Sequence, residues 1–161
     1  MGSPLDVNYV PSTTASVGAK LLRLEGSEPV VFELWDVPPQ SYAGSGIFAR
    51  YFRGAQAVVL VFSLQRPASW RALPTYLDVA RREIAAIETI APESGTSLPV
   101  LMVGNKRDCI DKDTQQEHDA ARSWCRDHGV AYIEMSALSG DSSTVLNVLK
   151  LLASTSNPSS S

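Results

Sequence analysis

Apolar residues at every second position mark a strand in the first part of the chain. Every second residue of the segment from Val30 to Trp35 is apolar, which places those side chains on one side of a strand. They are Val30, Phe32 and Leu34. Small and apolar residues also fill Ala15 to Glu25, and Gly26 supplies a turn between the two segments. The pattern predicts an antiparallel hairpin with one buried face.

Two later stretches consist of apolar residues without interruption. They are Ala57 to Phe62 and Pro99 to Val103. Continuous apolar runs of this length are typical of parallel strands that are covered on both faces. We therefore expect both strands to lie at the centre of a sheet.

A long amphipathic helix is predicted between these strands. From Trp70 to Ile87, apolar residues recur at steps of three and four, so that one stripe of the helix is apolar. The stripe consists of Trp70, Leu73, Leu77, Ala80, Ile84 and Ile87. Pro74 belongs near the first turn, where its missing N–H costs little.

A second helix is predicted from about Thr114 to His128, and Gly129 would end it. Its inward residues are Ala121, Trp124 and Cys125. The remaining positions are mostly polar, so His118 and His128 are expected on the solvated face.

The remaining elements complete the pattern of an α/β protein. A strand from Ala131 to Met135 follows the second helix, and a last helix runs from Ser143 to Ala153. The apolar face of this last helix carries Val145, Leu149 and Leu152. Alternating strands and helices favour a mostly parallel sheet, to which the hairpin adds an antiparallel strand. Such sheets bind their ligands at the carboxyl ends of the strands.

Composition and charge narrow the class of protein. The chain has 161 residues, of which 44% are hydrophobic, enough for one sizeable core. Its net charge of -3 and its pI near 5.3 indicate no basic surface for nucleic acid or for an anionic membrane. Cys109 and Cys125 lack the spacing of a zinc site, which favours free thiols in a reducing compartment. We expect a cytoplasmic protein without nucleic-acid partners.

Both ends of the chain are polar. Residues 1–8 are short and polar, and Ser154 to Ser161 is a tail of Ser, Asn, Pro and Thr. We expect both segments to be disordered around one domain of residues 9–153. The tail has no cysteine for a prenyl anchor, and no apolar run reaches the roughly 18 residues of a membrane helix. Membrane contact would then be peripheral and made through protein partners, without a direct lipid anchor.

The clearest candidate site follows the apolar strand that ends at Val103. The next residues, Gly104-Asn105-Lys106-Arg107-Asp108, resemble the guanine-recognition motif NKxD of the Ras superfamily. A carboxylate such as Asp108 can accept two parallel hydrogen bonds from the ring N–H and the amine of guanine, a pattern that adenine does not offer. Asn105 would tie neighbouring loops together, and the Lys106 stem would lie along the base. The same residue types are also common in ordinary polar turns.

Two further segments carry the same resemblance. Met135-Ser136-Ala137-Leu138 is similar to the family's SAK loop, whose backbone amide faces the guanine oxygen. Tyr51-Phe52-Arg53-Gly54-Ala55 resembles the YYRGA segment of Rab proteins. The resemblance implies a P-loop NTPase-like small GTPase domain of the Rab or Rab-like branch, with GTP or GDP and magnesium as cofactors. The nucleotide-binding residues that it implies are Asn105, Lys106, Asp108, Ser136, Ala137 and Leu138.

The segment after the hairpin departs from the family pattern. Trp35-Asp36 resembles the start of WDTAGQE, in which the glycine amide donates to the γ-phosphate and the glutamine positions the attacking water. Gln40 keeps the glutamine and is the catalytic candidate. Pro39 stands where the glycine should be and has no N–H to donate. The resemblance therefore implies a domain without competent GTP hydrolysis.

The same resemblance implies candidate magnesium ligands. Asp36 corresponds to the aspartate that holds the magnesium water shell. Tyr9 to Thr14 resembles the first switch segment, in which a threonine hydroxyl binds magnesium, and Ser12, Thr13 and Thr14 remain alternatives for that residue.

The family's opening strand, its GxxxxGK[ST] phosphate loop and its first helix have no counterpart before Tyr9. Gly18-Ala19-Lys20 lacks the first glycine and the hydroxyl after lysine, so we reject it as a phosphate loop. Because most of the binding energy comes from charged phosphate contacts, we expect GTP binding as well as hydrolysis to be impaired. Loss of the strand would expose sheet edges that a partner chain could cover. A truncated chain, a splice form or a degenerate domain completed by a partner would each explain the pattern.

Two interpretations of the function follow. The first is a Rab-like switch in vesicle or ciliary (intraflagellar) transport, which acts through protein effectors or transport-complex subunits. The segment Glu33 to Asp36 and its altered following loop resemble Rab-like proteins of cilia. The second is a pseudoGTPase, a nucleotide-independent interaction scaffold in which Asn105 and Asp108 are remnants. A flavodoxin-like or hydrolase domain is not supported, because no GxSxG elbow or glycine-rich dinucleotide fingerprint occurs.

Overall fold

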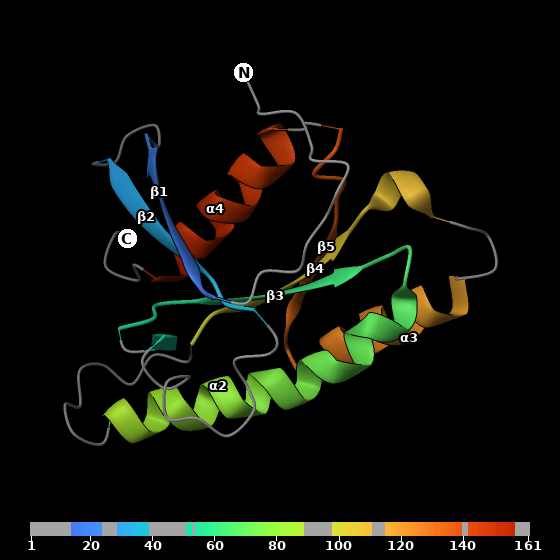
Figure 1. Ribbon diagram of the computed structural model, residues 1–161, viewed down its shortest axis with the longest axis horizontal. Coiled ribbons are helices and arrows are strands. Elements are labelled where there is room, and N and C mark those ends of the chain that lie inside the picture. Colours follow the sequence, from blue (N-terminus) through green and yellow to red (C-terminus); the bar gives the residue numbers. More distant parts are fainter. Residues whose placement is uncertain are drawn as a thin grey trace. The chain divides into compact units, whose positions relative to one another are not determined.

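The computed structural model describes residues 14–23, 29–38, 51–52, 54–88, 98–110, 115–139 and 142–156 (Figure 1). The chain divides into two compact units, which lie within Ser3–Ala55 and within Gln56–Ser161. Each unit is described by itself. The segments at 1–13, 39–50 and 111–114, and therefore Thr13, Pro39 and Gln40, lie outside the described residues.

The first unit contains an antiparallel hairpin. Its strands are β1 (Ser16–Leu22) and β2 (Val30–Asp36), and their register pairs Ser16 with Asp36 and Leu22 with Val30. This confirms the hairpin that the alternating pattern predicts. The indole Nε1 of Trp35 donates to Glu33 Oε1 at 2.7 Å, and its ring lies 6.0 Å from that of Tyr51.

The prediction of one buried face on this hairpin is wrong for most positions. Val30 and Phe32 are half-buried, whereas Leu34 is exposed, as are Val17, Leu21 and Val31. A two-stranded ribbon has no core of its own, so alternation alone does not bury a face. Burial would require a second layer over that face.

The second unit is built on a parallel sheet. Its strands are β3 (Val58–Ser63), β4 (Val100–Asn105) and β5 (Ala131–Glu134), in the order β3-β4-β5. β3 and β4 pair in parallel from Val58 opposite Val100, and β4 and β5 from Leu101 opposite Ala131. The parallel sheet and the antiparallel hairpin strands are therefore both present. Among the described residues they form separate sheets.

Helices cover both sides of the parallel sheet. The α-helices are α2 (Leu73–Glu88), α3 (Gln115–Asp127) and α4 (Ser142–Ser156). Two short 3-10 helices, η2 (Pro67–Ala72) and η3 (Arg107–Cys109), precede α2 and follow β4, respectively. Figure 1 shows α2 and α3 on one side of the sheet and α4 on the other. No helix in the described ranges is long and apolar enough to cross a membrane.

The helix boundaries agree closely with the sequence pattern. Pro74 is the second residue of α2, where a missing N–H is tolerated. Gly129 follows the end of α3 and adopts φ 64°, the left-handed conformation that commonly ends a helix. α4 continues to Ser156, beyond the predicted end of the domain at Ala153, and its Val145 is exposed although it was expected to face inward.

The core lies between the sheet and its helices. The predicted α2 stripe is buried at Leu73, Leu77, Ala80 and Ile84. Leu101, Met102 and Val103 of β4 are buried as well, which confirms β4 as the central strand of the three. The Cys125 thiol of α3 contacts the Met102 sulfur at 3.4 Å, and burial raises the pKa of Cys125 to about 11.

The prediction that β3 is covered on both faces is wrong. Leu60 and Phe62 are buried, but Val59 and Val61 are 41% and 56% exposed. Among the described residues β3 lies at the edge of the sheet, and its face with Val59 and Val61 is incompletely covered. A continuous apolar run identifies a strand here without showing which of its faces is covered.

His118 also contradicts its predicted place on a solvated surface. Its side chain is 1% exposed, and its Nε2 lies 3.0 Å from the carbonyl oxygen of Leu64, which follows β3. This hydrogen bond satisfies the buried ring and ties α3 to the end of β3. His128 is exposed as predicted, and its ring stacks on that of Trp124 at 4.3 Å.

We expect the substitution Leu101→Ala to lower the free energy of unfolding by about 2 to 5 kcal/mol, because it leaves a cavity at a fully buried position of β4. The matched substitution Val61→Ala removes an exposed side chain and should cost less than about 1 kcal/mol. Urea unfolding monitored by circular dichroism measures both. Equal losses in the two variants would contradict this assignment of the core.

Candidate functional site

The polar residues singled out from the sequence meet where β4 and β5 end. The amide of Met135 donates to the carbonyl of Gly104 at 2.8 Å, and the amide of Arg107 donates to the carbonyl of Met135 at 3.1 Å. Met135 is therefore bonded on both sides of the Asn105-Lys106 turn. We call the residues 104–109 and 135–139 the base-recognition corner.

Asn105 joins the two loops of the corner. Its side-chain oxygen accepts hydrogen bonds from the amides of Lys106, at 2.7 Å, and Ala137, at 3.0 Å. Its carbonyl accepts from the amide of Leu64 at 2.8 Å, which links the corner to the end of β3. One residue at the end of β4 thus holds the segments that follow both neighbouring strands.

Lys106 turns the chain sharply after β4. It adopts φ 65° and is the one described non-glycine residue with a positive φ. This left-handed conformation costs roughly 1 to 2 kcal/mol for a residue with a side chain. The turn is followed by η3, in which the amide of Cys109 donates to the Lys106 carbonyl at 2.9 Å. The strained turn directs the chain so that Asp108 faces the β5 loop.

Asp108 is an exposed carboxylate that is held by two side-chain donors. The Ser136 hydroxyl donates to its Oδ1, and the Cys109 thiol donates to its Oδ2 at 3.1 Å. These bonds, that of Ser136 first, hold the pKa of Asp108 below its usual value. Each carboxylate oxygen keeps a further lone pair. Asp108 is therefore an oriented anion that can still accept hydrogen bonds.

The β5 loop shapes the other side of the corner. Ser136 is buried, accepts from the amide of Ser139 at 3.3 Å, and its carbonyl accepts from the Ser139 hydroxyl at 2.8 Å. Leu138, at the tip of this turn, is 62% exposed. The corner thus combines a fixed carboxylate, an exposed apolar side chain and the exposed Lys106. Such a combination suits a flat, polar-edged ring.

The magnesium candidates that the structure describes belong to the hairpin unit. Asp36 ends β2 and pairs with Ser16, so Thr14 and Asp36 lie at the same end of the hairpin. Their carboxylate and hydroxyl oxygens are hard donors of the kind that Mg²⁺ prefers. Thr13 and the catalytic candidate Gln40 lie outside the described residues. No group of three or more His, Cys, Asp or Glu ligands occurs among the residues described.

Sequence reasoning missed several residues that shape the corner. A side chain at Gly104 would place its Cβ 2.8 Å from a Leu64 carbon, and 3.2 Å from the Tyr132 hydroxyl. Glycine allows this approach as it stands, whereas a larger residue at position 104 would require Leu64 or Tyr132 to shift. Arg122, Tyr132 and Glu134 form a polar network next to the corner. The alternation of Tyr132 and Glu134 along β5 was the signal that could have placed both on one face.

Comparison with known proteins places these residues in one family pattern. The Ras family pattern matches residues 7–156, which include the hairpin and the base-recognition corner. The chain is also similar to the Ras-related protein Rab-7b of Homo sapiens. The two are 29% identical over 146 residues, which make up 91% of this chain and 67% of Rab-7b.

The thiol of Cys109 can report on Asp108. Its hydrogen bond to Asp108 is the main cause that raises the pKa of Cys109, so less thiolate is present near neutral pH. We expect Asp108→Asn to lower that pKa and to speed alkylation by iodoacetamide at pH 8. The alkylation rate should rise about threefold for each unit by which the pKa falls. The gain in thiolate is partly offset, because a thiolate of lower pKa is intrinsically less nucleophilic.

Peptide mass spectrometry measures this rate at Cys109 separately from the buried Cys125. The matched control is Asp127→Asn, which removes the same charge at an exposed position on α3. An equal rate in the wild type and Asp108→Asn would show that this carboxylate does not hold the thiol.

Proposed function

Because the chain belongs to the Ras family of small GTPases, we propose that it is a Rab-like switch domain whose base-recognition corner binds guanine nucleotides. Proteins of this family generally bind GTP or GDP together with Mg²⁺. The similarity to Rab-7b supports the Rab-related branch. The Rab-like role, the residues that bind the nucleotide and the impaired hydrolysis are all parts of this proposal.

One observation carries the proposal. Asp108 is exposed, charged and oriented by Ser136, from a loop 28 residues away in sequence. A carboxylate in this state can accept the ring N–H and the exocyclic amine of guanine in parallel, whereas adenine presents no such pair of donors. The corner is therefore suited to select guanine.

The other corner residues have roles consistent with base binding. The stem of Lys106 and the exposed Leu138 supply apolar contact on the faces of the base. The amide of Ala137 is the donor for the base oxygen. It also donates to Asn105 in the structure, so the base oxygen would share or replace that bond. Asn105 keeps the two loops at the spacing that the base requires.

The hydrolytic machinery is proposed to be impaired. Asp36 and Thr13 or Thr14 would hold Mg²⁺, which supplies charge neutralisation for the phosphates when it is bound. Gln40 would orient the attacking water. Pro39 lacks the N–H that the glycine of this segment gives to the γ-phosphate, so one stabilising donor is lost. The domain would then act mainly through the nucleotide that it holds.

A pseudoGTPase scaffold is the alternative. Pro39 favours it, and so does the edge strand β3, whose exposed Val59 and Val61 suit coverage by a partner chain. In either case the partners are protein effectors or subunits of a transport complex. The setting is the cytoplasm, in vesicle or ciliary transport, with membrane contact made through those partners. The next experiment separates the two functions.

We expect the chain to bind GDP in preference to ADP, and Asp108→Asn to lower GDP affinity by about 10- to 150-fold. The reason is the loss of hydrogen bonds to a charged acceptor. The same variant should gain affinity for xanthosine diphosphate, because an amide can donate to the C2 oxygen of xanthine. Isothermal titration calorimetry with Mg²⁺ measures each dissociation constant.

Asp127→Asn serves as the control for the change of charge and should bind GDP as the wild type does. Equal affinity of the wild type for GDP and ADP would reject guanine selection. Partner binding that is unaffected by Asp108→Asn, in a chain without GDP affinity, would support the scaffold instead.

We further expect Pro39→Gly and Pro39→Ala to raise GTP turnover at saturating GTP and Mg²⁺. Both restore the missing N–H, and a hydrogen bond to a charged group is worth about tenfold or more. A larger gain for glycine than for alanine would separate backbone freedom from the donor itself. Phosphate release under single-turnover conditions gives the rate. If Gln40→Ala leaves the gain of Pro39→Gly intact, the water-positioning role of Gln40 is wrong.

A further inference from the structure

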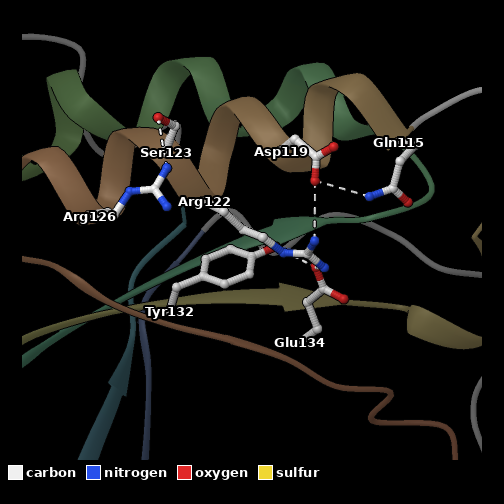
Figure 2. A network of polar contacts seen from close by, with 7 residues as sticks. All are labelled: Gln115, Asp119, Arg122, Ser123, Arg126, Tyr132 and Glu134. Carbon is white, nitrogen blue, oxygen red and sulfur yellow. Dashed lines mark hydrogen bonds and ion pairs between the residues drawn. The ribbon is translucent and has the colours of Figure 1, made fainter.

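A polar network connects α3 to the last residues of β5 (Figure 2). The Arg122 guanidinium donates to Glu134 Oε1 at 2.5 Å through one nitrogen, and to Asp119 Oδ1 at 3.2 Å through another. The Tyr132 hydroxyl donates to the same Glu134 oxygen at 2.8 Å. Gln115 reaches Asp119 at 3.0 Å, which completes the chain of bonds along the first turns of α3.

Burial makes this network different from an ordinary surface ion pair. The side chain of Glu134 is only 11% exposed, whereas that of Arg122 is 44% exposed. A largely buried carboxylate loses its hydration and needs a cation and hydrogen-bond donors in place of water. Arg122 and Tyr132 supply both, and the Arg122 guanidinium also lies 5.8 Å from the centre of the Tyr132 ring. Loss of Arg122 would leave Glu134 without a cation and free it to turn towards solvent.

The network ends where the base-recognition corner begins. Glu134 pairs with Gly104 across the β4–β5 register, and the next residue, Met135, makes the backbone hydrogen bonds on both sides of the turn. The Tyr132 hydroxyl lies 3.2 Å from the position of a Cβ on Gly104. Glu134 is thus two residues before Ser136, whose hydroxyl donates to Asp108, so a displaced Glu134 would act on that contact through a short, hydrogen-bonded segment.

We propose that Arg122 is a positioning residue for guanine recognition, which holds the end of β5 through Glu134 so that Ser136 keeps Asp108 aligned. The inference rests on the proposed function for its ligand, but the geometry that it describes lies wholly within the unit Gln56–Ser161. Arg122 touches no nucleotide in this role. It acts on specificity through the position of Asp108.

The first test compares GDP with inosine diphosphate, which lacks the exocyclic amine that Asp108 would accept. In the wild type GDP should bind at least about tenfold more tightly. Arg122→Gln should reduce this preference to below about threefold, because a misaligned carboxylate cannot accept both donors. Arg122→Lys keeps a cation beside Glu134 and should retain most of the preference.

The chain offers a matched control on the same helix. Arg126 lies one turn after Arg122, and the hydrogen bond described for it goes to Ser123 of its own helix at 3.3 Å (Figure 2). Arg126→Gln removes the same charge and should leave the GDP preference unchanged. Glu134→Gln removes the charge that Arg122 holds and should reproduce the loss, which keeps the test decisive if Arg122→Gln folds poorly.

A second readout does not depend on nucleotide. Because the Cys109 thiol donates to Asp108, displacement of that carboxylate should speed alkylation of Cys109 by about threefold in Arg122→Gln but not in Arg126→Gln. If neither the wild type nor any variant binds GDP, the proposed function fails. Faster alkylation of Cys109 in Arg122→Gln, but not in Arg126→Gln, would then still support the positioning role. An unchanged preference for GDP over inosine diphosphate in Arg122→Gln would overturn the positioning role. If the chain does not bind GDP, an unchanged rate of Cys109 alkylation in Arg122→Gln would overturn it.

Discussion

The base-recognition corner depends on the parallel pairing of β4 with β5. Parallel strands end at the same edge of a sheet, and the register of this pair brings Gly104 opposite Glu134. Met135 then bonds to Gly104 through its amide and to Arg107 through its carbonyl. If the register slipped by one residue, every side chain of β5 would change face. The contacts of Asn105, Asp108 and Ser136 all follow from this one alignment.

The corner combines local strain with strong hydrogen bonds. Lys106 occupies a left-handed conformation that costs free energy, and the bonds of Asn105 to Lys106 and Ala137 offset that cost. The same bonds fix the distance between the two loops. The hydrogen bonds from Ser136 and Cys109 orient the exposed carboxylate of Asp108 and hold its pKa below its usual value. A recognition group that is ordered in advance spends less binding free energy on ordering its loops.

Sequence patterns predicted the order and type of the elements, because periodicity reports which positions can be buried. The same patterns wrongly predicted that both faces of β3 and one face of the hairpin are buried. Burial of a face depends on other segments of the chain that pack against it, and the local pattern does not report these. His118 was misplaced for a related reason. Its ring forms a hydrogen bond with the carbonyl of Leu64, 54 residues away in sequence, and the polar pattern of α3 does not indicate that partner. Asn105, Asp108 and Ser136, which meet in the candidate site, could be singled out from the sequence by residue type. Their mutual contacts, and the close approach of Leu64 and Tyr132 to Gly104, required the structure.

The division of the chain into two units separates two kinds of chemistry. All residues proposed to recognise the base, together with the Arg122 network, belong to the unit Gln56–Ser161, whereas Asp36, Thr14 and Pro39 belong to the unit Ser3–Ala55. The hydrogen bonds that orient Asp108 involve no residue of the hairpin unit. The proposed loss of a phosphate donor at Pro39 would therefore leave the hydrogen bonds that orient Asp108 as they are. Under the proposed function, base recognition and hydrolysis therefore rest on different residues, so that a substitution can affect one without the other.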